Sequence, residues 1–369
     1  MGNYFEKRLS DLRQRMAATK TDLVAIGPGS HLRWLLGLDP HGDERPVMAL
    51  VTANHIGVLM PSLNAASSRL HCDVDFYEWS DDVGPKTALQ NLLRDGGAIY
   101  PKMTVVLDET MRTDFAFLLL ESLENPVYRF TQDTIGILRS QKDEHEYLAL
   151  KDCARLNDGA FKAAFAALRN GVTEAEIRDV LVDFYVANGA KSEFCIVAFG
   201  ENSTFPHYHT GNDILRPNMA VLIDSGCRLN GYPSDMTRCA WYGQPNKEFE
   251  EIASIVERAA HLAREASQPG TPCCDVDHAA RNVIEEAGYG HAFLHRTGHG
   301  LGIDVHEPPY ITASSKSILT VGNVFSIEPG IYLEGKFGVR LEDIVFLKSD
   351  CAEVLSELPL GVVQIHEKN

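Results

Sequence analysis

The stretch VLIDSGCRLNGYPSDMTR (221–238) places two aspartates, Asp224 and Asp235, on either side of a short turn. The Asn-Gly pair at 230–231 is a strong signal for a two-residue β-hairpin turn, because both positions of that turn need a positive φ. Counting outward from the turn sets Asp235 opposite Gly226. Side chains alternate along a strand, so Asp224 shares a face with Gly226 and is a diagonal neighbour of Asp235. The hairpin therefore predicts two carboxylates within reach of one shared ion.

Three further candidate ligands, His299, Glu328 and Glu342, follow in the motifs GHGLGIDVHE (298–307), IEPG (327–330) and VRLED (339–343). A cluster of four acids repels itself, so it is stable only around cations. Carboxylate oxygens with one imidazole suit a pair of divalent transition metals, an arrangement that activates water. Together the five residues predict a dinuclear metal site.

The motifs IDSG (223–226) and IEPG (327–330) echo each other, since each places an acid after Ile and two residues before Gly. Each is followed by a second predicted strand that carries another acid, Asp235 or Glu342. This echo predicts a duplicated helix–hairpin architecture around a pseudo-twofold axis. Arg340 is predicted to share a strand face with Glu342 and to orient it or offset negative charge; the alternative is a surface ion pair.

Histidines crowd the segment HRTGHGLGIDVHE (295–307), which holds His295, His299 and His306 among three glycines. Glycine removes bulk and lets backbone and substrate approach closely. This density favours a functional segment over ordinary polar residues. His207 lies in a loop-like stretch just before the first acidic strand and, taken by itself, is typical of a surface histidine.

The composition is that of an ordinary globular protein, with 44% hydrophobic and 23% charged residues in a chain of 369. The formal net charge of −17 argues against nucleic acid as a partner. No run of about 18 apolar residues is present, so no membrane span is expected. The N-terminal stretch has no signal-peptide core, and the eight cysteines form no CxxC pair. We therefore expect a cytoplasmic protein with reduced thiols.

Two domains are expected from the length and from the order of the predicted elements. In residues 1–135, short apolar strands alternate with helices, which predicts a small α/β domain. Its predicted strands are 22–27, 47–52, 55–61 and 103–109, and its helices are 4–18, 86–95 and 112–123. Residues 136–369 are predicted to form the catalytic domain, in which Thr173 begins a T-x-x-E capping box. Its predicted helices are 142–168, 174–188, 246–267 and 275–287, and its strands fall within 193–241 and 291–348.

These ordered motifs resemble those of the pita-bread metallopeptidases, which include methionine aminopeptidase, aminopeptidase P, prolidase and creatinase. The resemblance covers about residues 140–360 and favours the Xaa-Pro dipeptidase (prolidase) branch. It implies an α/β (α+β) chain with a pita-bread catalytic domain, a creatinase-type N-terminal domain and a homodimer. It also implies two divalent ions, Mn²⁺ before Co²⁺, Zn²⁺ or Fe²⁺, that share a water and convert it to hydroxide.

Carried over by position, the resemblance assigns the metal ligands Asp224, Asp235, His299, Glu328 and Glu342, with Asp235 and Glu342 bridging the ions. It also gives Glu328 the transfer of a proton to the leaving nitrogen. His306 and His207 are expected to contact the substrate and stabilise the developing oxyanion. His295 and Arg340 match supporting positions around the site.

The motifs predict a water molecule activated by two metal ions as the attacking group. They do not identify the substrate. Hydrolysis of Xaa-Pro dipeptides is the leading hypothesis, and the compact length favours it over an Xaa-Pro aminopeptidase. A prolyl bond offers no N–H for recognition, so Phe194, Phe205 and Tyr208 are candidates for an apolar wall around the ring. The alternatives are a small molecule, such as creatine, a compatible solute or a sulfonium compound, and an inactive binding module. The intact set of five ligands argues against the last.

Overall fold

The computed structural model describes residues 2–366. The chain divides into two compact units, Met1–Arg139 and Ser140–Asn369. The boundary expected from the sequence, 135/136, lies at the start of helix α6 (Ile135–Ser140), and the observed one lies at the end of the same helix.

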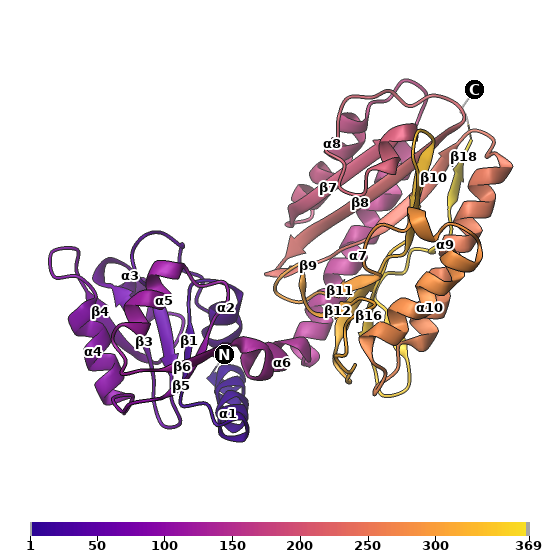
Figure 1. Ribbon diagram of the computed structural model, residues 1–369. Helices are drawn as coiled ribbons and strands as arrows, with labels where there is room; N and C mark the ends of the chain where they lie inside the picture. Colours follow the sequence, from indigo (N-terminus) through magenta and orange to yellow (C-terminus); the bar gives the residue numbers. More distant parts are fainter. Residues whose placement is uncertain (1, 367–369) are drawn as a thin grey trace. The chain divides into compact units, whose positions relative to one another are not determined.

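The first unit is built on one six-stranded sheet with the strand order β4-β3-β2-β1-β5-β6, and helices lie around it (Figure 1). Its elements are α1 (Gly2–Thr19), β1 (Leu23–Ile26), α2 (Ser30–Leu36), β2 (Met48–Val51), β3 (Ile56–Pro61), α3 (Ser62–Ser68), β4 (Asp75–Trp79), α4 (Lys86–Asp95), β5 (Thr104–Leu107), α5 (Thr113–Leu120), β6 (Val127–Phe130) and α6. Every residue of the central strands β1 and β2 is buried, which explains their uninterrupted apolar sequences. The predicted strands of this unit are confirmed, and β4 and β6 at the two edges are additional.

The second unit begins with two capped helices. Asp143 and Thr173 each accept a hydrogen bond from a backbone N–H in the first turn, and both caps are capping boxes. The predicted capping box at Thr173 is therefore confirmed. The elements of this unit are α7 (Glu144–Ala167), α8 (Glu174–Ala187), β7 (Lys191–Phe199), β8 (Met219–Leu229), β9 (Tyr232–Pro233), β10 (Thr237–Tyr242), α9 (Lys247–Ala266), α10 (Cys273–Glu286), β11 (Gly298–Gly300), β12 (Glu307–Ile311), β13 (Val324–Ile327), β14 (Gly330–Leu333), β15 (Phe337–Arg340), β16 (Asp343–Leu347), β17 (Ala352–Val354) and β18 (Val363–Ile365).

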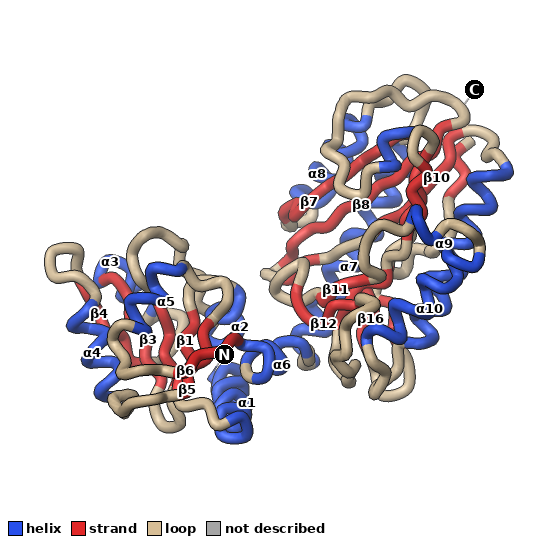
Figure 2. Tube along the Cα trace, in the orientation of Figure 1, coloured by secondary structure: helices blue, strands red, loops and turns tan. Residues whose placement is uncertain are grey.

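Strand β8 contributes to two hydrophobic cores of the second unit, one on each of its faces. Ala220 and Leu222 pack into a core that includes residues of α9 and α10. Val221 and Ile223, on the opposite face, pack into a core with α7 and α8. Figure 2 shows β8 between β7 and β10, with these helices around them. A strand buried on both faces has little tolerance for a charge, so Asp224 on β8 is an exception that needs a function.

The hairpin that follows Asp224 has the register expected from its turn. Asn230 and Gly231 have φ values of 51° and 91°. Leu229 pairs with Tyr232 beside the turn, and Asp224 pairs with Thr237 farther along, which is the same count outward from 230–231. The prediction that Asp224 and Asp235 are diagonal neighbours is confirmed.

The expectation that Arg340 and Glu342 lie on one strand is wrong. Strand β15 ends at Arg340 and β16 begins at Asp343, so Glu342 lies in the connection between them. There the chain leaves a two-stranded sheet, β14-β15, and enters the five-stranded sheet β12-β11-β13-β16-β17. The backbone N–H of Glu342 donates to the carbonyl of Thr237, and its own carbonyl accepts from Arg238. Glu342 is therefore positioned by β10 and not by strand alternation.

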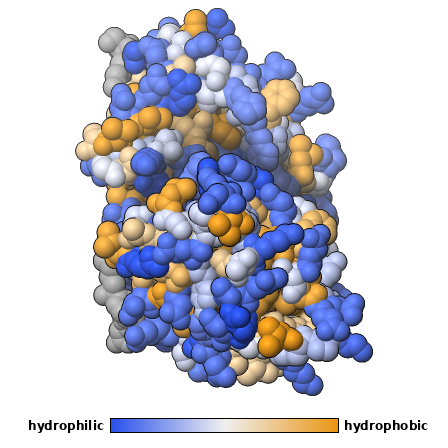
Figure 3. Space-filling model, turned by 90° about the vertical axis from the view of Figure 1, so that its left-hand side faces the viewer, coloured by the Kyte–Doolittle hydropathy of each residue, from blue (hydrophilic) through white to orange (hydrophobic). Residues whose placement is uncertain are grey.

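Figure 3 shows a face on which hydrophobic residues are scattered among hydrophilic ones. Among residues 2–366, no helix combines the length and the apolar character that crossing a membrane requires. All eight cysteines are free thiols.

Candidate metal centre

The five predicted ligands come together in the second unit. Asp224 lies on β8, and Asp235 lies between β9 and β10. His299 lies on β11, Glu328 directly follows β13, and Glu342 lies between β15 and β16. Ligand atoms of Asp224, Asp235 and Glu342 lie within 4.8 Å of one another, and so do those of His299, Glu328 and Glu342. Glu342 belongs to both groups.

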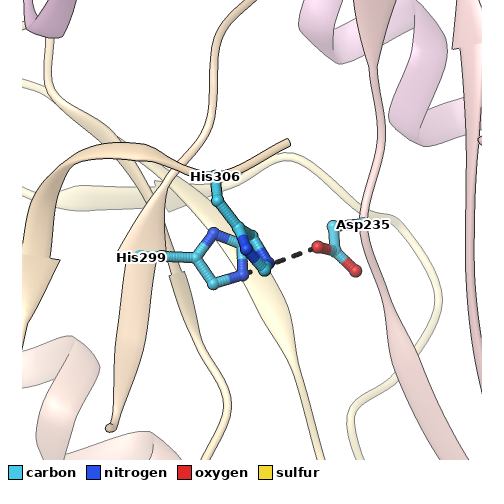
Figure 4. Close-up of side chains that lie close together, drawn as sticks. All are labelled: Asp235, His299 and His306. Carbon is cyan, nitrogen blue, oxygen red and sulfur yellow. Dashed lines mark ion pairs between the residues drawn. The ribbon is translucent and has the colours of Figure 1, made fainter. Parts of the chain in front are cut away.

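His299 lies close to one acid of each of these two groups. Its Nε2 lies 3.3 Å from Glu328 Oε1 and 3.6 Å from Asp235 Oδ2. Figure 4 shows Asp235 facing His299, with the ring of His306 against that of His299 at a centroid distance of 4.0 Å. Asp235, His299 and His306 form a third group of ligand atoms within 4.8 Å. Asp235 thus also belongs to two groups.

Burial makes this cluster costly without cations. Burial, and then the neighbouring charges of Glu342 and Asp224, raise the pKa of Asp235 well above its ordinary value. The pKa of Glu342 rises in the same way, through burial and the charges of Glu328 and Asp224. Burial raises the pKa of Glu328 to about 7. Two divalent cations would remove the repulsion that these shifts reflect.

The donor atoms present fit metal ions. Nδ1 of His299 lies 3.1 Å from the carbonyl of Gly300, which can only accept, so Nδ1 carries the proton and Nε2 offers a lone pair to the cluster. Burial lowers the pKa of His299 to about 3, which keeps the ring neutral. Asp224 Oδ1 is buried and has no hydrogen-bond partner among the described residues. A buried carboxylate oxygen that accepts no hydrogen bond is a candidate ligand atom for a cation.

Close backbone approach makes room for the cluster. A Cβ on Gly298 would lie 1.9 Å from the carbonyl oxygen of Ser326, and one on Gly226 would lie 2.1 Å from that of Ser234. Neither position accepts a side chain, which confirms that glycine serves here to let neighbouring strands meet. The two contacts set β11 beside β13 and Asp224 beside the Asp235 segment.

A hydrogen-bonded chain leads from the cluster to His295. Arg340 donates from Nη2 to Asp224 Oδ2 at 2.6 Å and from Nη1 to the Tyr332 hydroxyl at 2.7 Å. The Tyr332 oxygen lies 2.8 Å from His295 Nε2. Because His295 Nδ1 donates to the carbonyl of Arg296, Nε2 accepts the Tyr332 proton. Burial and the charge of Arg340 lower the pKa of His295 to about 4, so the ring stays neutral.

Arg340 is thus buried beside the proposed ligands. The alternative that it forms a surface ion pair is excluded. Its Nε also donates to the Thr237 hydroxyl, which in turn donates to Glu342 Oε2 at 2.7 Å. Arg340 therefore orients Asp224 directly and Glu342 through the Thr237 hydroxyl.

A cavity of about 930 Å³ opens onto the cluster. It is lined by the five predicted ligands and by His207, His295, His306 and Arg340. His207 is therefore brought to the cavity, although its surroundings in the sequence are those of a surface loop. Phe194 and Tyr208 also line the cavity, whereas Phe205 is not among the lining residues and is 59% exposed. The expectation for Phe205 is wrong, because its side chain turns to solvent.

Glu174 holds the loop that carries His207, a role that the sequence did not reveal. This carboxylate is fully buried. Oε1 accepts from the backbone of Phe199 and from the Asn202 amide, and Oε2 accepts from the Tyr208 hydroxyl and the backbone of Gly211. In the sequence Glu174 is only the first helical residue after Thr173. Tyr332 was missed because it lies in a short apolar strand, where the sequence gives no sign of a functional role.

Within its described part, the first unit has one group of candidate ligands, His31, Asp108 and Glu109. Nη1 of Arg139 lies 3.1 Å from Nδ1 of His31. A guanidinium at this distance occupies the ring nitrogen and repels a cation, so this group does not suit a metal ion.

The family model for metallopeptidase family M24 matches residues 149–349, which is 201 of the 369 residues. The chain is also 35% identical over 350 residues to a probable dipeptidase, PepE, of Mycobacterium tuberculosis, with 93% of this chain and 92% of the relative covered. The chain belongs to metallopeptidase family M24. The predicted family is thereby confirmed.

Two further relatives extend the comparison. An uncharacterized peptidase of Staphylococcus aureus is 40% identical over 225 residues, which covers 60% of this chain and 64% of that protein. The chain thus matches just under two thirds of that relative's length. The crystal structure of a recombinant prolidase from Thermococcus sibiricus superposes with a TM-score of 0.90 at 30% identity, over 99% of this chain and all of that one. The predicted pita-bread fold with a smaller N-terminal domain is confirmed.

Proposed function

We propose that this protein is a metal-dependent dipeptidase that hydrolyses the Xaa-Pro bond. The observation that carries the proposal is the convergence of four carboxylates and His299 beneath a cavity large enough for a small peptide. The likeness to a prolidase and to a probable dipeptidase supports the choice of substrate.

Two divalent ions, with Mn²⁺ as the first choice, would supply an acidified water and polarise the scissile carbonyl. Asp224, Asp235, His299, Glu328 and Glu342 are the proposed ligands. Asp235 and Glu342 each belong to two of the ligand groups, which supports a bridging role for both.

The chain's own side chains position the reacting groups. Arg340 fixes Asp224 Oδ2, and the Ser326 hydroxyl fixes Glu328 Oε1 at 3.0 Å. This leaves Glu328 Oε2 to accept a proton from the attacking water and to pass it to the proline ring nitrogen as the bond breaks. His306 and His207 reach the cavity from different loops, and we assign to them the hydrogen bonds that stabilise the oxyanion. Through Tyr332, His295 keeps Arg340 in place.

The test is hydrolysis of Ala-Pro, Ala-Pro-Ala and a panel of small amidines and betaines by protein that has been chelated and reloaded with Mn²⁺. We expect turnover of Ala-Pro. Turnover of the tripeptide alone would indicate an aminopeptidase, and turnover of a small amidine or betaine alone would indicate the small-molecule alternative.

The variant Asp235→Asn keeps the shape of the side chain and removes its charge. We expect it to lose stoichiometric metal, measured by elemental analysis after dialysis, and at least about 100-fold of the activity. The matched control is Asp350→Asn, an exposed aspartate in the bend that follows β16, which should behave as wild type. Metal retention and full activity in Asp235→Asn would refute the proposed site.

A further inference from the structure

Three arginines line the cavity: Arg178, Arg296 and Arg340. Arg340 is bound to Asp224, and Arg178 forms a 2.7 Å ion pair with Asp179. Arg296 differs from both. Among the described residues no carboxylate lies within ion-pair distance of its guanidinium, which instead lies over the ring of Tyr310 at 4.8 Å from the centroid.

The position of Arg296 is tied to the metal centre. Tyr310 on β12 is the direct cross-strand partner of His299 on β11. Arg296 itself lies three residues before His299, and its carbonyl accepts the proton of His295 Nδ1. The backbone on which the guanidinium is carried and the ring on which it lies are therefore both fixed relative to the proposed ligands.

Charge balance leaves Arg296 without a counter-ion in the working site. The four acids of the cluster carry four negative charges, against four positive charges on two divalent ions and one on Arg340, so no acid of the cluster is left over for Arg296. Glu193, the remaining acid on the cavity wall, forms a 2.7 Å ion pair with Arg228. Arg296 is half-buried, so its positive charge is costly unless an anion lies against it. In the metal-loaded site that anion has to come from outside the chain.

We propose that Arg296, held against Tyr310, binds a carboxylate of the substrate. The proposal rests on the proposed dipeptidase function and deepens it. The guanidinium fork matches a carboxylate with two parallel hydrogen bonds. In an Xaa-Pro dipeptide the C-terminal carboxylate is attached to the carbon next to the scissile nitrogen, so it cannot lie far from the metal centre. The side chain of an acidic first residue offers the same chemistry.

The experiment compares the Mn²⁺-loaded wild type with Arg296→Gln and Arg296→Lys on Ala-Pro, Ala-prolinamide and Glu-Pro. If the C-terminal carboxylate is bound, Arg296→Gln raises KM for Ala-Pro and Glu-Pro by about tenfold or more and changes Ala-prolinamide less than about twofold. If the side chain is bound, the loss is confined to Glu-Pro. Arg296→Lys keeps the charge without the fork and should fall between wild type and Arg296→Gln. The control is Arg155→Gln, an exposed arginine paired with Glu357 on the surface.

Equal losses on all three substrates would mean that Arg296 only supports the structure, and the proposal would be overturned. No loss on any substrate would overturn it as well. A wild type that cleaves no Xaa-Pro compound contradicts the proposed function and not Arg296 itself. In that case calorimetric titration with Ala-Pro, Glu-Pro and Ala-prolinamide decides: weaker binding of a carboxylate-bearing compound by Arg296→Gln, with the amide unchanged or unbound, supports the proposal, and equal or absent binding overturns it.

Discussion

At the scale of single residues, the candidate metal centre is defined by buried acids whose negative charges are unfavourable without cations. Asp235 and Glu342 are 7% and 2% exposed, and each faces other acids. Burial of a charge is expensive unless an opposite charge compensates it. Arg340 compensates in part, since the nearby acids and Tyr332 raise its pKa against the effect of burial. The remaining repulsion makes the metal-free protein sensitive to pH.

We expect metal-free protein to lose stability as the pH rises from about 5 to about 7. The pKa of Glu328 rises from 4.5 to about 7 on folding, so its stabilising contribution is complete below the unfolded value and is lost as the pH passes the folded value. The raised pKa values of Asp235 and Glu342 act in the same direction. The increase in Tm on adding Mn²⁺ should therefore be larger near neutral pH than under mildly acidic conditions.

The control for this prediction is Glu328→Gln, whose amide cannot ionise. The metal-free variant should show a smaller loss of Tm over the same pH range than the metal-free wild type. An equal loss in the two proteins would contradict the assignment.

At the scale of elements, the connection between β11 and β12 carries His306 and is held by a buried ion pair. Lys142 Nζ lies 2.7 Å from Glu307 Oε1, with side-chain exposures of 1% and 5%. Glu307 Oε2 accepts from the backbone of Asp304 within the same connection. The backbone of Lys142 donates to the carbonyl of Gly322. The segment before α7 thus fixes the residue next to His306.

Lys142→Met should lower the free energy of unfolding by about 3–5 kcal/mol, because it leaves the buried Glu307 carboxylate without its cation. The double variant Lys142→Met/Glu307→Leu should recover part of that loss. Urea denaturation at neutral pH measures both. The comparison is Lys336→Met, which breaks an exposed pair with Glu248 and should cost less than about 1 kcal/mol. Similar losses for the two lysines would contradict the role of the buried pair.

At the scale of the whole molecule, the two units have separate cores and an unequal share of the chemistry. The core of the first unit includes residues of β1, β2, β5, α4 and α5, whereas all five proposed ligands lie in the second. Ligand binding stabilises the structure that binds it. Metal should therefore act mainly on the second unit.

Hydrogen exchange measured with and without Mn²⁺ tests this. We expect added metal to slow exchange in β8, β10, β13 and β16, which flank the ligands, and to leave β1, β2 and β5 little changed. Protection that rises equally in both units would show instead that they open as one cooperative body.

How much of this could be predicted is clearest from particular elements. The hairpin register, the capping box at Thr173 and the central strands β1 and β2 all depend on neighbours in the chain, and all were predictable. The edge strands β4 (DFYEW) and β6 (VYRF) mix polar and apolar residues and are partly exposed, so no buried pattern marks them.

The sequence by itself determined the order of the motifs that carry the five proposed ligands, the shared face of Asp224 and Asp235, and the family, because these depend on local periodicity and on ordered motifs. Only the tertiary structure decided that Glu342 leaves its strand, that Tyr332 joins Arg340 to His295, and that Arg296 has no acidic partner among residues 2–366. These facts depend on contacts between segments far apart in the chain. Such contacts are set by how two buried sheets and their helices pack, which no spacing along the chain records.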